Sequence, residues 1–174
     1  MTEHIWPLLR LKAATDEELE EAYRRVYIET YVRDADGKDI ELYDWQGNRI
    51  IFNARTFDHA FSESTDYRFS SGIHDISFSK KRARYILWIK EVIAATKGRI
   101  ERRHQLHKDN RGRFSKKRRI LIVVEERYVV VLEERKHMKE LEFITAFLAD
   151  ENGLRHLRSV SNFMEIKNPS LNGD

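Results

Sequence analysis

The sequence predicts an α+β fold in which N-terminal helices pack on a four-stranded antiparallel meander sheet. Residues 79–98 carry apolar side chains at helical spacing, with Ser79 placed to cap the helix and Gly98 to end it. Four strand-like segments then follow with short links, which is typical of antiparallel pairing. These segments span residues 99–107, 119–124, 128–134 and 141–149. The long helix is expected to cover one face of the sheet.

An additional helix is predicted over residues 16–31. Thr15 is followed three residues later by Glu18, the capping-box pattern that begins many helices. The side chains of one helical face then recur at the expected spacing: Leu19, Ala22, Tyr23, Val26 and Thr30. The N-terminal part of the chain therefore contributes at least one helix.

A hairpin is predicted after this helix. Its strands lie near residues 40–43 and 49–52, and its turn is at Gln46-Gly47-Asn48. The helix and hairpin together suggest an N-terminal elaboration over residues 1–52. The main domain would then comprise residues 53–174.

Arg82 has an unusual position in the predicted long helix. It lies four residues before Ile86 and seven before Ile89, so it shares the apolar face. A guanidinium on an apolar face is costly unless it meets an anion. Arg84 projects about 160° away, at about 100° per residue, and is better placed for solvent. The alternative is that Arg82 pairs with an acid from the N-terminal elaboration.

Charge is unevenly distributed along the chain. Residues 1–66 hold 8 Lys/Arg against 15 Asp/Glu, whereas residues 67–174 hold 24 against 14. Residues 97–119, called here the basic segment, hold 11 basic residues and only two acids. Such a segment attracts polyanions, because each Lys or Arg that meets a phosphate releases a condensed counterion. The alternative is an ordinary solvated loop, which most charge runs form.

Several classes of protein lack support in the sequence. There is no cysteine, and therefore no disulfide, thiolate nucleophile or Cys-based metal site. The histidines form no HExxH pattern, and neither a phosphate-binding glycine loop nor a GxSxG motif occurs. No apolar run is long enough to span a bilayer, and no secretory signal follows Met1. We therefore expect a cytoplasmic protein that uses no metal and no cofactor and does not associate with membranes.

Three residues remain as candidates for chemistry. His59 lies between Phe57 and Phe61, and an imidazole can exchange protons near neutral pH. Arg82 could hold a phosphate, and the Thr145 hydroxyl could donate to a phosphate oxygen. Each also has a structural interpretation, since histidines beside aromatic rings and threonines in strands commonly serve packing alone.

The order of three motifs resembles a known group of proteins. "HAF" at residues 59–61, "SKKRARYILWIKEVI" at residues 79–93 and "FITAFLAD" at residues 143–150 follow one another. This arrangement resembles the phage-associated nuclease-like proteins of the barnase–EndoU–colicin–RelE group, over residues 57–150. The resemblance implies N-terminal helices on a four-stranded antiparallel sheet and metal-independent cleavage of RNA. Residues 53–174 would form the nuclease-like domain, and residues 1–52 match no part of the group.

The resemblance also implies roles for individual residues. His59 matches the group's N-terminal histidine, an arginine of "KRAR" its helix arginine, and Thr145 its hydroxyl residue on the last strand. We favour Arg82 for the helix arginine because of the face it shares. His59 would transfer a proton, while Arg82 and Thr145 would stabilise charge on the scissile phosphate.

The basic segment and Arg84 would then hold flanking phosphates, with Phe114 and His104 available for stacking on unpaired bases. The expected nucleic-acid-binding residues are Arg84, Arg99, Arg102, Arg103, His104, Lys116, Lys117 and Arg118. The expected partner is RNA, with transfer RNA as one candidate. A toxin-like or mobile-element nuclease would also have an immunity or antitoxin protein as a candidate partner.

Two other functions fit the same residues. One is a non-catalytic nucleic-acid-binding module, which would bind in a salt-sensitive way without cleavage. The other is an interaction protein of a mobile element, in which the acidic N-terminal part folds back on the basic part. Removal of residues 1–52 would strengthen RNA binding in that case.

Overall fold

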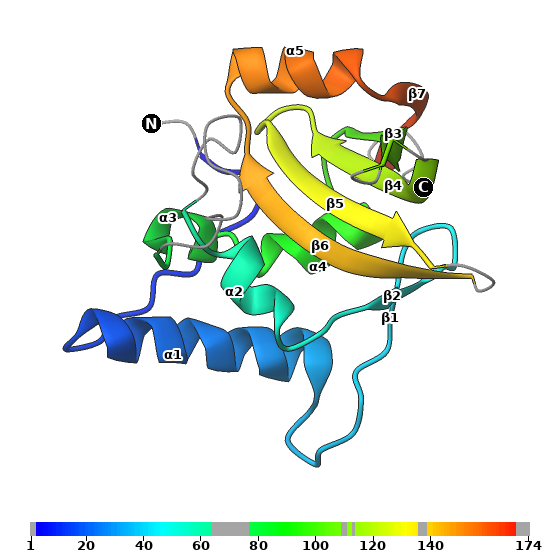
Figure 1. The fold of residues 1–174 in the computed structure, drawn as a ribbon. Helices are drawn as coiled ribbons and strands as arrows, with labels where there is room; N and C mark the ends of the chain where they lie inside the picture. Colours follow the sequence, from blue (N-terminus) through cyan, green and yellow to red (C-terminus); the bar gives the residue numbers. More distant parts are fainter. Residues whose placement is uncertain (1–2, 64–76, 109–110, 113, 136–138, 170–174) are drawn as a thin grey trace.

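The computed structural model describes residues 3–63, 77–108, 111–112, 114–135 and 139–169 (Figure 1). The helices are α1 (Asp16–Tyr27), the π-helix η1 (Ile28–Val32), α2 (Thr56–Ala60), α3 (Lys80–Ala83), α4 (Trp88–Ala94) and α5 (Glu151–Ser159). The strands are β1 (Leu42–Tyr43), β2 (Arg49–Ile51), β3 (Ile100–Lys108), β4 (Phe114–Val123), β5 (Tyr128–Glu134), β6 (Glu140–Leu148) and β7 (Asn162–Lys167). In this part of the chain, no helix is both long and apolar enough to cross a membrane.

The strands form one mixed sheet in the order β1-β2-β6-β5-β4-β3-β7. The consecutive strands β3, β4, β5 and β6 pair antiparallel, whereas β2 pairs parallel with β6. The chain is α+β, but the predicted four-stranded antiparallel sheet is wrong. The hairpin β1–β2 extends the sheet beyond β6, and β7 extends it beyond β3.

Two features explain why local pattern does not predict the full width of the sheet. The parallel pairing joins Arg49 to Glu140, which are far apart in sequence. β7 is an edge strand with Phe163, Met164 and Ile166 exposed, so it lacks the alternation that marks a half-buried strand. Sequence spacing alone therefore underestimates the width of the sheet.

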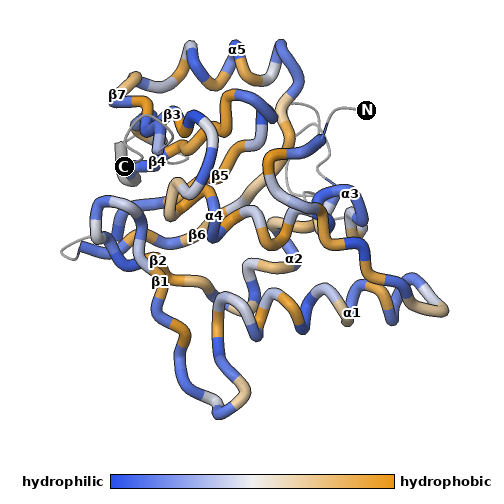
Figure 2. The backbone as a smooth tube through the Cα atoms, turned by 180° about the vertical axis from the view of Figure 1, so that it is seen from behind, coloured by the Kyte–Doolittle hydropathy of each residue, from blue (hydrophilic) through white to orange (hydrophobic). Residues whose placement is uncertain are grey.

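Helices lie on both sides of the sheet, with α1–α4 on one side and α5 on the other (Figure 1). The larger apolar cluster, on the α1–α4 side, contains residues from both sides of the predicted boundary after Phe52, including Tyr27, Ile50 and Trp88. A smaller cluster under α5 contains Ile120, Ile122, Val129, Val131 and Leu154. In Figure 2, hydrophobic and hydrophilic residues alternate along α1, as expected for a helix with one buried face.

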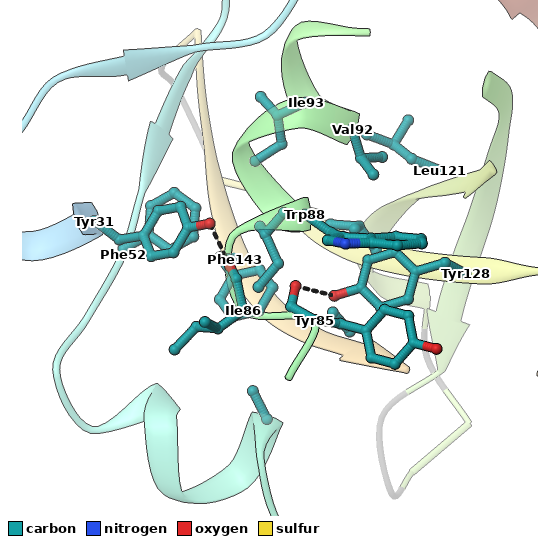
Figure 3. Packing of buried hydrophobic residues seen from close by; sticks show 14 of the residues in the cluster. Tyr31, Phe52, Tyr85, Ile86, Trp88, Val92, Ile93, Leu121, Tyr128 and Phe143 are labelled. Carbon is teal, nitrogen blue, oxygen red and sulfur yellow. Dashed lines mark hydrogen bonds between the residues drawn. The ribbon is translucent and has the colours of Figure 1, made fainter. Parts of the chain in front are cut away.

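The predicted continuous helix over residues 79–98 is wrong, because the chain divides it into α3 and α4. At the break, three successive carbonyls accept hydrogen bonds from donors elsewhere. The Leu9 amide donates to Arg84, the Tyr128 hydroxyl to Tyr85 and the Tyr31 hydroxyl to Ile86 (Figure 3). These donors satisfy carbonyls that a continuous helix would pair internally.

The two tyrosines that support the break are themselves buried. Burial raises the pKa of Tyr31 and of Tyr128 above the ordinary value, so both hydroxyls stay protonated and can donate. The break also changes the position of Arg82, because helical spacing no longer relates it to Ile86 and Ile89 beyond the turn. The position of Arg82 therefore depends on the contacts of α3 and not on helical spacing.

Two local predictions near the N-terminus are confirmed. The Thr15 hydroxyl accepts a hydrogen bond of 3.1 Å from the Glu18 amide, so Thr15 caps α1. β1 and β2 pair antiparallel about a turn in which Gly47 has a φ of 85°, a left-handed conformation that favours glycine. The helix α1 ends at Tyr27, and the chain continues from Ile28 as the π-helix η1.

Candidate functional site

His59 lies on α2, a short helix held in place from two sides. Phe57 and Ala60 of this helix are buried in the larger cluster. On the α1 side, the Arg24 guanidinium lies 2.7 Å from the Asp58 carboxylate. These contacts fix α2 and leave the His59 side chain exposed. The histidine can therefore meet a ligand without a change in the core.

Arg82 lies on α3, whose first turn is capped by the Ser79 hydroxyl, which accepts from the Arg82 amide at 3.2 Å. The side chain is half-buried. Its Nη1 donates a long hydrogen bond of 3.5 Å to the Ala60 carbonyl. Its Cζ lies 5.8 Å from the centroid of the Phe147 ring. The guanidinium therefore spans the space between α2 and β6.

Thr145 lies on β6, opposite Val131 of β5. Val131 and Phe147 both pack in the cluster under α5, so the register places Thr145 on the same face of the sheet. Thr145 is half-buried and lies two residues before Phe147 on the strand. Arg82, whose guanidinium lies over the Phe147 ring, thus reaches the face that carries Thr145.

Thr145 thus faces the α5 side of the sheet, whereas α2 and α3 lie on the other side. The elements that carry the three candidates meet along β6, and the three residues are called here the β6 edge site (His59, Arg82, Thr145). Both α2 and α3 contact β6. Arg82 contacts the carbonyl of Ala60, which follows His59 on α2, and the ring of Phe147 on β6. An imidazole, a permanent cation and a hydroxyl donor are groups that can bind a phosphate ester and assist its cleavage.

A pocket of about 470 Å³ lies on another side of α2, toward α1. Four of its lining residues are acidic: Asp16, Glu17, Glu20 and Asp58. This negative lining disfavours a phosphate. We therefore do not place the candidate phosphate position in this pocket.

Within the basic segment, Arg103 is buried and makes four hydrogen bonds. It lies 2.8 Å from Glu101 and also donates to the Ser161 side chain and to the carbonyls of Arg158 and Ser161. Burial raises the pKa of Glu101, but hydrogen bonds from Arg158 and Arg103 outweigh it and leave that pKa below its ordinary value. This cluster joins β3 to α5 and is a structural element of the fold.

Other arginines of the basic segment also have acidic partners. Arg99 pairs with Glu125 at 2.9 Å. Arg102 pairs with Glu165, Arg118 with Glu133 and Arg119 with Glu134, at 3.3, 3.3 and 3.2 Å. Much of the charge density that the sequence suggests is therefore balanced by acids on neighbouring strands and turns.

His104 is half-buried, and its Nε2 lies 2.7 Å from the Arg102 guanidinium. Burial, and then the charges of Arg102 and Arg119, lower its pKa below the ordinary value. Lys117 is exposed and Arg84 is half-buried. Lys116 and Phe114 lie on β4, and their side chains fall outside the described part of the chain.

The sequence does not predict the contact between Arg82 and Phe147. Phe147 fits a strand core by pattern, yet its ring faces the Arg82 guanidinium. The sequence could have indicated this contact, because Thr145 and Phe147 are two residues apart and therefore share a face of the strand. Among the described residues, no three histidine, aspartate or glutamate side chains gather as a metal-binding group.

Comparison with known proteins gives no relative. No known protein family matches the chain, and neither the curated proteins nor the solved structures contain a significant match.

Proposed function

We propose that the protein is a metal-independent endoribonuclease that acts at the β6 edge site. The observation that carries this proposal is the position of Arg82, between the helix of His59 and the strand of Thr145. The guanidinium contacts the carbonyl of the residue that follows the exposed His59, and it reaches the sheet face that carries Thr145. These groups can together support metal-independent cleavage of an RNA phosphodiester by its own 2′-hydroxyl.

His59 would transfer the proton in the reaction. As a base it would take the proton of a ribose 2′-hydroxyl, whose oxygen then attacks phosphorus while the bond to the 5′-oxygen breaks. As an acid it would give a proton to the departing 5′-oxygen. The products are a 2′,3′-cyclic phosphate and a 5′-hydroxyl, and atoms balance without any further reactant.

Arg82 and Thr145 would act on the phosphate. The guanidinium would hold the non-bridging oxygens and stabilise the charge that develops there, and the hydroxyl would donate a further hydrogen bond. Removal of one such donor typically slows catalysis by about 10²–10³-fold. Lys117, together with Lys116 and Arg84, would bind flanking phosphates.

The ionic pairing of the basic segment favours an enzyme over a passive binding module. A binding module would depend on a dense cationic surface, whereas Arg99, Arg102, Arg103 and Arg118 are taken up by acids of the fold. The resemblance to the barnase–EndoU–colicin–RelE group supports RNA as substrate and a toxin-like or phage-associated role in the cytoplasm. It also suggests an immunity protein as partner.

The proposal is tested by incubating the full chain with transfer RNA and with total RNA, in the presence and absence of EDTA. We expect cleavage in both conditions, with fragments that end in a 2′,3′-cyclic phosphate. Salt-sensitive binding without fragments would support the non-catalytic alternative and overturn the proposal. Cleavage that EDTA abolishes would overturn the metal-independent mechanism.

A further inference from the structure

A second pocket lies away from the β6 edge site. It occupies about 510 Å³ between η1, the loop over residues 33–40, and β2 with the residues that follow it. Most of its lining is apolar, with Tyr31, Ile40 and Phe52 among the wall residues. Pockets of this size and character commonly hold small organic ligands.

The polar lining of this pocket has an unusual member. Arg49 contributes to the wall, and its Nε is buried without a hydrogen-bond partner among the described residues. A buried donor without a partner destabilises the fold, because no hydrogen bond compensates for its loss of water. Arginines elsewhere in the fold, such as Arg102 and Arg103, are matched with acids. Arg49 therefore lines the pocket with a guanidinium whose Nε is not paired by the described part of the chain.

Charge in the rest of the lining also favours an anion. Arg33 lies at the pocket and is 3.7 Å from Asp39, and both side chains are well exposed. The pocket lining therefore carries two guanidinium groups and one carboxylate. An excess of one positive charge fits a ligand with a single negative charge better than a phosphate dianion.

The wall of the pocket is rigid before any ligand binds. The rings of Tyr31 and Phe52 stack with centroids 4.5 Å apart, and Figure 3 shows the Tyr31 hydroxyl bonded to the helix break. The π-helix η1 presents Ile28 and Tyr31 to the pocket, and the Arg33 amide donates to the Ile28 carbonyl at 2.8 Å. Such π-helical turns occur often at functional sites.

We propose that this pocket binds an organic carboxylate with an apolar body. Arg49 would donate to the carboxylate in a bidentate manner, and the Tyr31–Phe52 wall would contact the apolar body. The carboxylate could belong to a free carboxylic acid or to the C-terminus of a peptide, since the same chemistry recognises both. This inference stands on its own residues and does not depend on the proposed nuclease activity.

The test uses hexanoate as the probe, titrated into the full chain and followed by NMR shift changes and calorimetry. Hexan-1-ol tests the need for the charge, and Arg49→Gln removes the guanidinium at similar length. Arg25→Gln, on the exposed surface of α1, is the matched control. We expect Arg49→Gln to weaken hexanoate binding about tenfold or more, because charge-assisted hydrogen bonds are lost, and Arg25→Gln to leave it unchanged.

A tripeptide that ends in leucine, compared with its C-terminal amide, identifies the source of the carboxylate. If the tripeptide binds, its C-terminal amide does not, and Arg49→Gln abolishes binding of the tripeptide, the peptide source is supported. Tighter binding of hexanoate than of the tripeptide would support the free acid. The inference is overturned if hexan-1-ol binds as tightly as hexanoate, if Arg49→Gln retains full affinity, or if neither carboxylate binds at millimolar concentration. The melting temperature of Arg49→Gln, expected unchanged or slightly raised, shows that the variant is folded.

Discussion

Two regions of this protein use arginine in different ways. Where β3, β4 and β7 meet α5, the arginines face carboxylates, and Arg103 makes four hydrogen bonds within the fold. At the β6 edge site, Arg82 lies against the carbonyl of Ala60, which follows the exposed His59, and over the face of the Phe147 ring. The first region is far richer in positive charge along the sequence, yet the second is where we propose that a phosphate binds.

This difference teaches that charge density along a chain is a poor guide to where an anion binds. Adjacent strands of a sheet bring acids to basic residues, as Glu165 does for Arg102 and Glu133 for Arg118. The position of a cation relative to a proton donor and a hydroxyl is more informative. Substitutions in the two regions should therefore affect different properties.

The largest effect is expected at His59. The substitution His59→Ala should reduce RNA cleavage by about 10³-fold or more, since a general acid–base group contributes about 10²–10⁴-fold. Because the side chain is exposed, the melting temperature should stay within about 2 °C of the original. Cleavage rates and thermal unfolding are measured on the same preparations. Full activity in this variant would remove His59 from the mechanism.

The next effect distinguishes the two neighbouring arginines of "KRAR". Arg82→Ala should slow cleavage by about 10²–10³-fold through loss of phosphate stabilisation. Arg84→Ala should slow it only a few-fold, since Arg84 lies in the turn between α3 and α4. Rates under single-turnover conditions provide the comparison, and Arg82→Lys tests whether charge alone suffices. Equal losses for Arg82→Ala and Arg84→Ala would contradict the assignment.

The paired region should respond in stability. Arg103→Ala should lower the free energy of unfolding by about 3 kcal/mol, because it leaves the buried Glu101 with one partner fewer. Cleavage by the folded fraction should change less than about threefold. Chemical denaturation measures the first quantity. A stable but inactive Arg103→Ala variant would show that the two regions are not separate in function.

The pH dependence of stability provides a control for the same cluster. The pKa of Glu101 is lower in the folded protein than its ordinary value of 4.5. Its ion pairs therefore stabilise the fold above about pH 4.5 and are lost as the pH falls through the lowered value. The difference in stability between the original chain and Glu101→Gln should shrink over that range, and a constant difference would contradict the sign of the shift.

The smallest effect is expected at Lys117, which is exposed on β4. If it contacts one flanking phosphate, Lys117→Ala should reduce RNA affinity a few-fold and lower the slope of log affinity against log salt by about 1. Affinity is measured at several salt concentrations with the inactive His59→Ala variant. An unchanged slope would place RNA on another surface.

Local signals in the sequence predict local structure well. The Thr15 cap and the turn at Gly47 depend on residues within a few positions of each other, and both are found. The break between α3 and α4 depends on the hydroxyls of Tyr31 and Tyr128, which are 55 and 43 residues away from the carbonyls they meet. Helical periodicity contains no information about such distant donors, so it predicts one continuous helix.

The same reasoning applies to the site and to the sheet. The helices of His59 and Arg82 contact the strand of Thr145, but Thr145 faces the α5 side of the sheet and the face argument for Arg82 depends on a helix that is broken. The pairing of Glu101 with Arg103 and Arg158 is set by strand register and by α5. Neither is visible in the spacing of charges along the chain.

The central claim is that Arg82 and Thr145 act on one phosphate. A double-mutant cycle tests it most directly, with RNA cleavage rates of Arg82→Ala, Thr145→Val and the double variant. We predict that the double variant is little slower than the slower single variant, because both substitutions remove stabilisation of the same charge. Independent effects that multiply, or full activity in Thr145→Val, would contradict a shared site at the edge of β6.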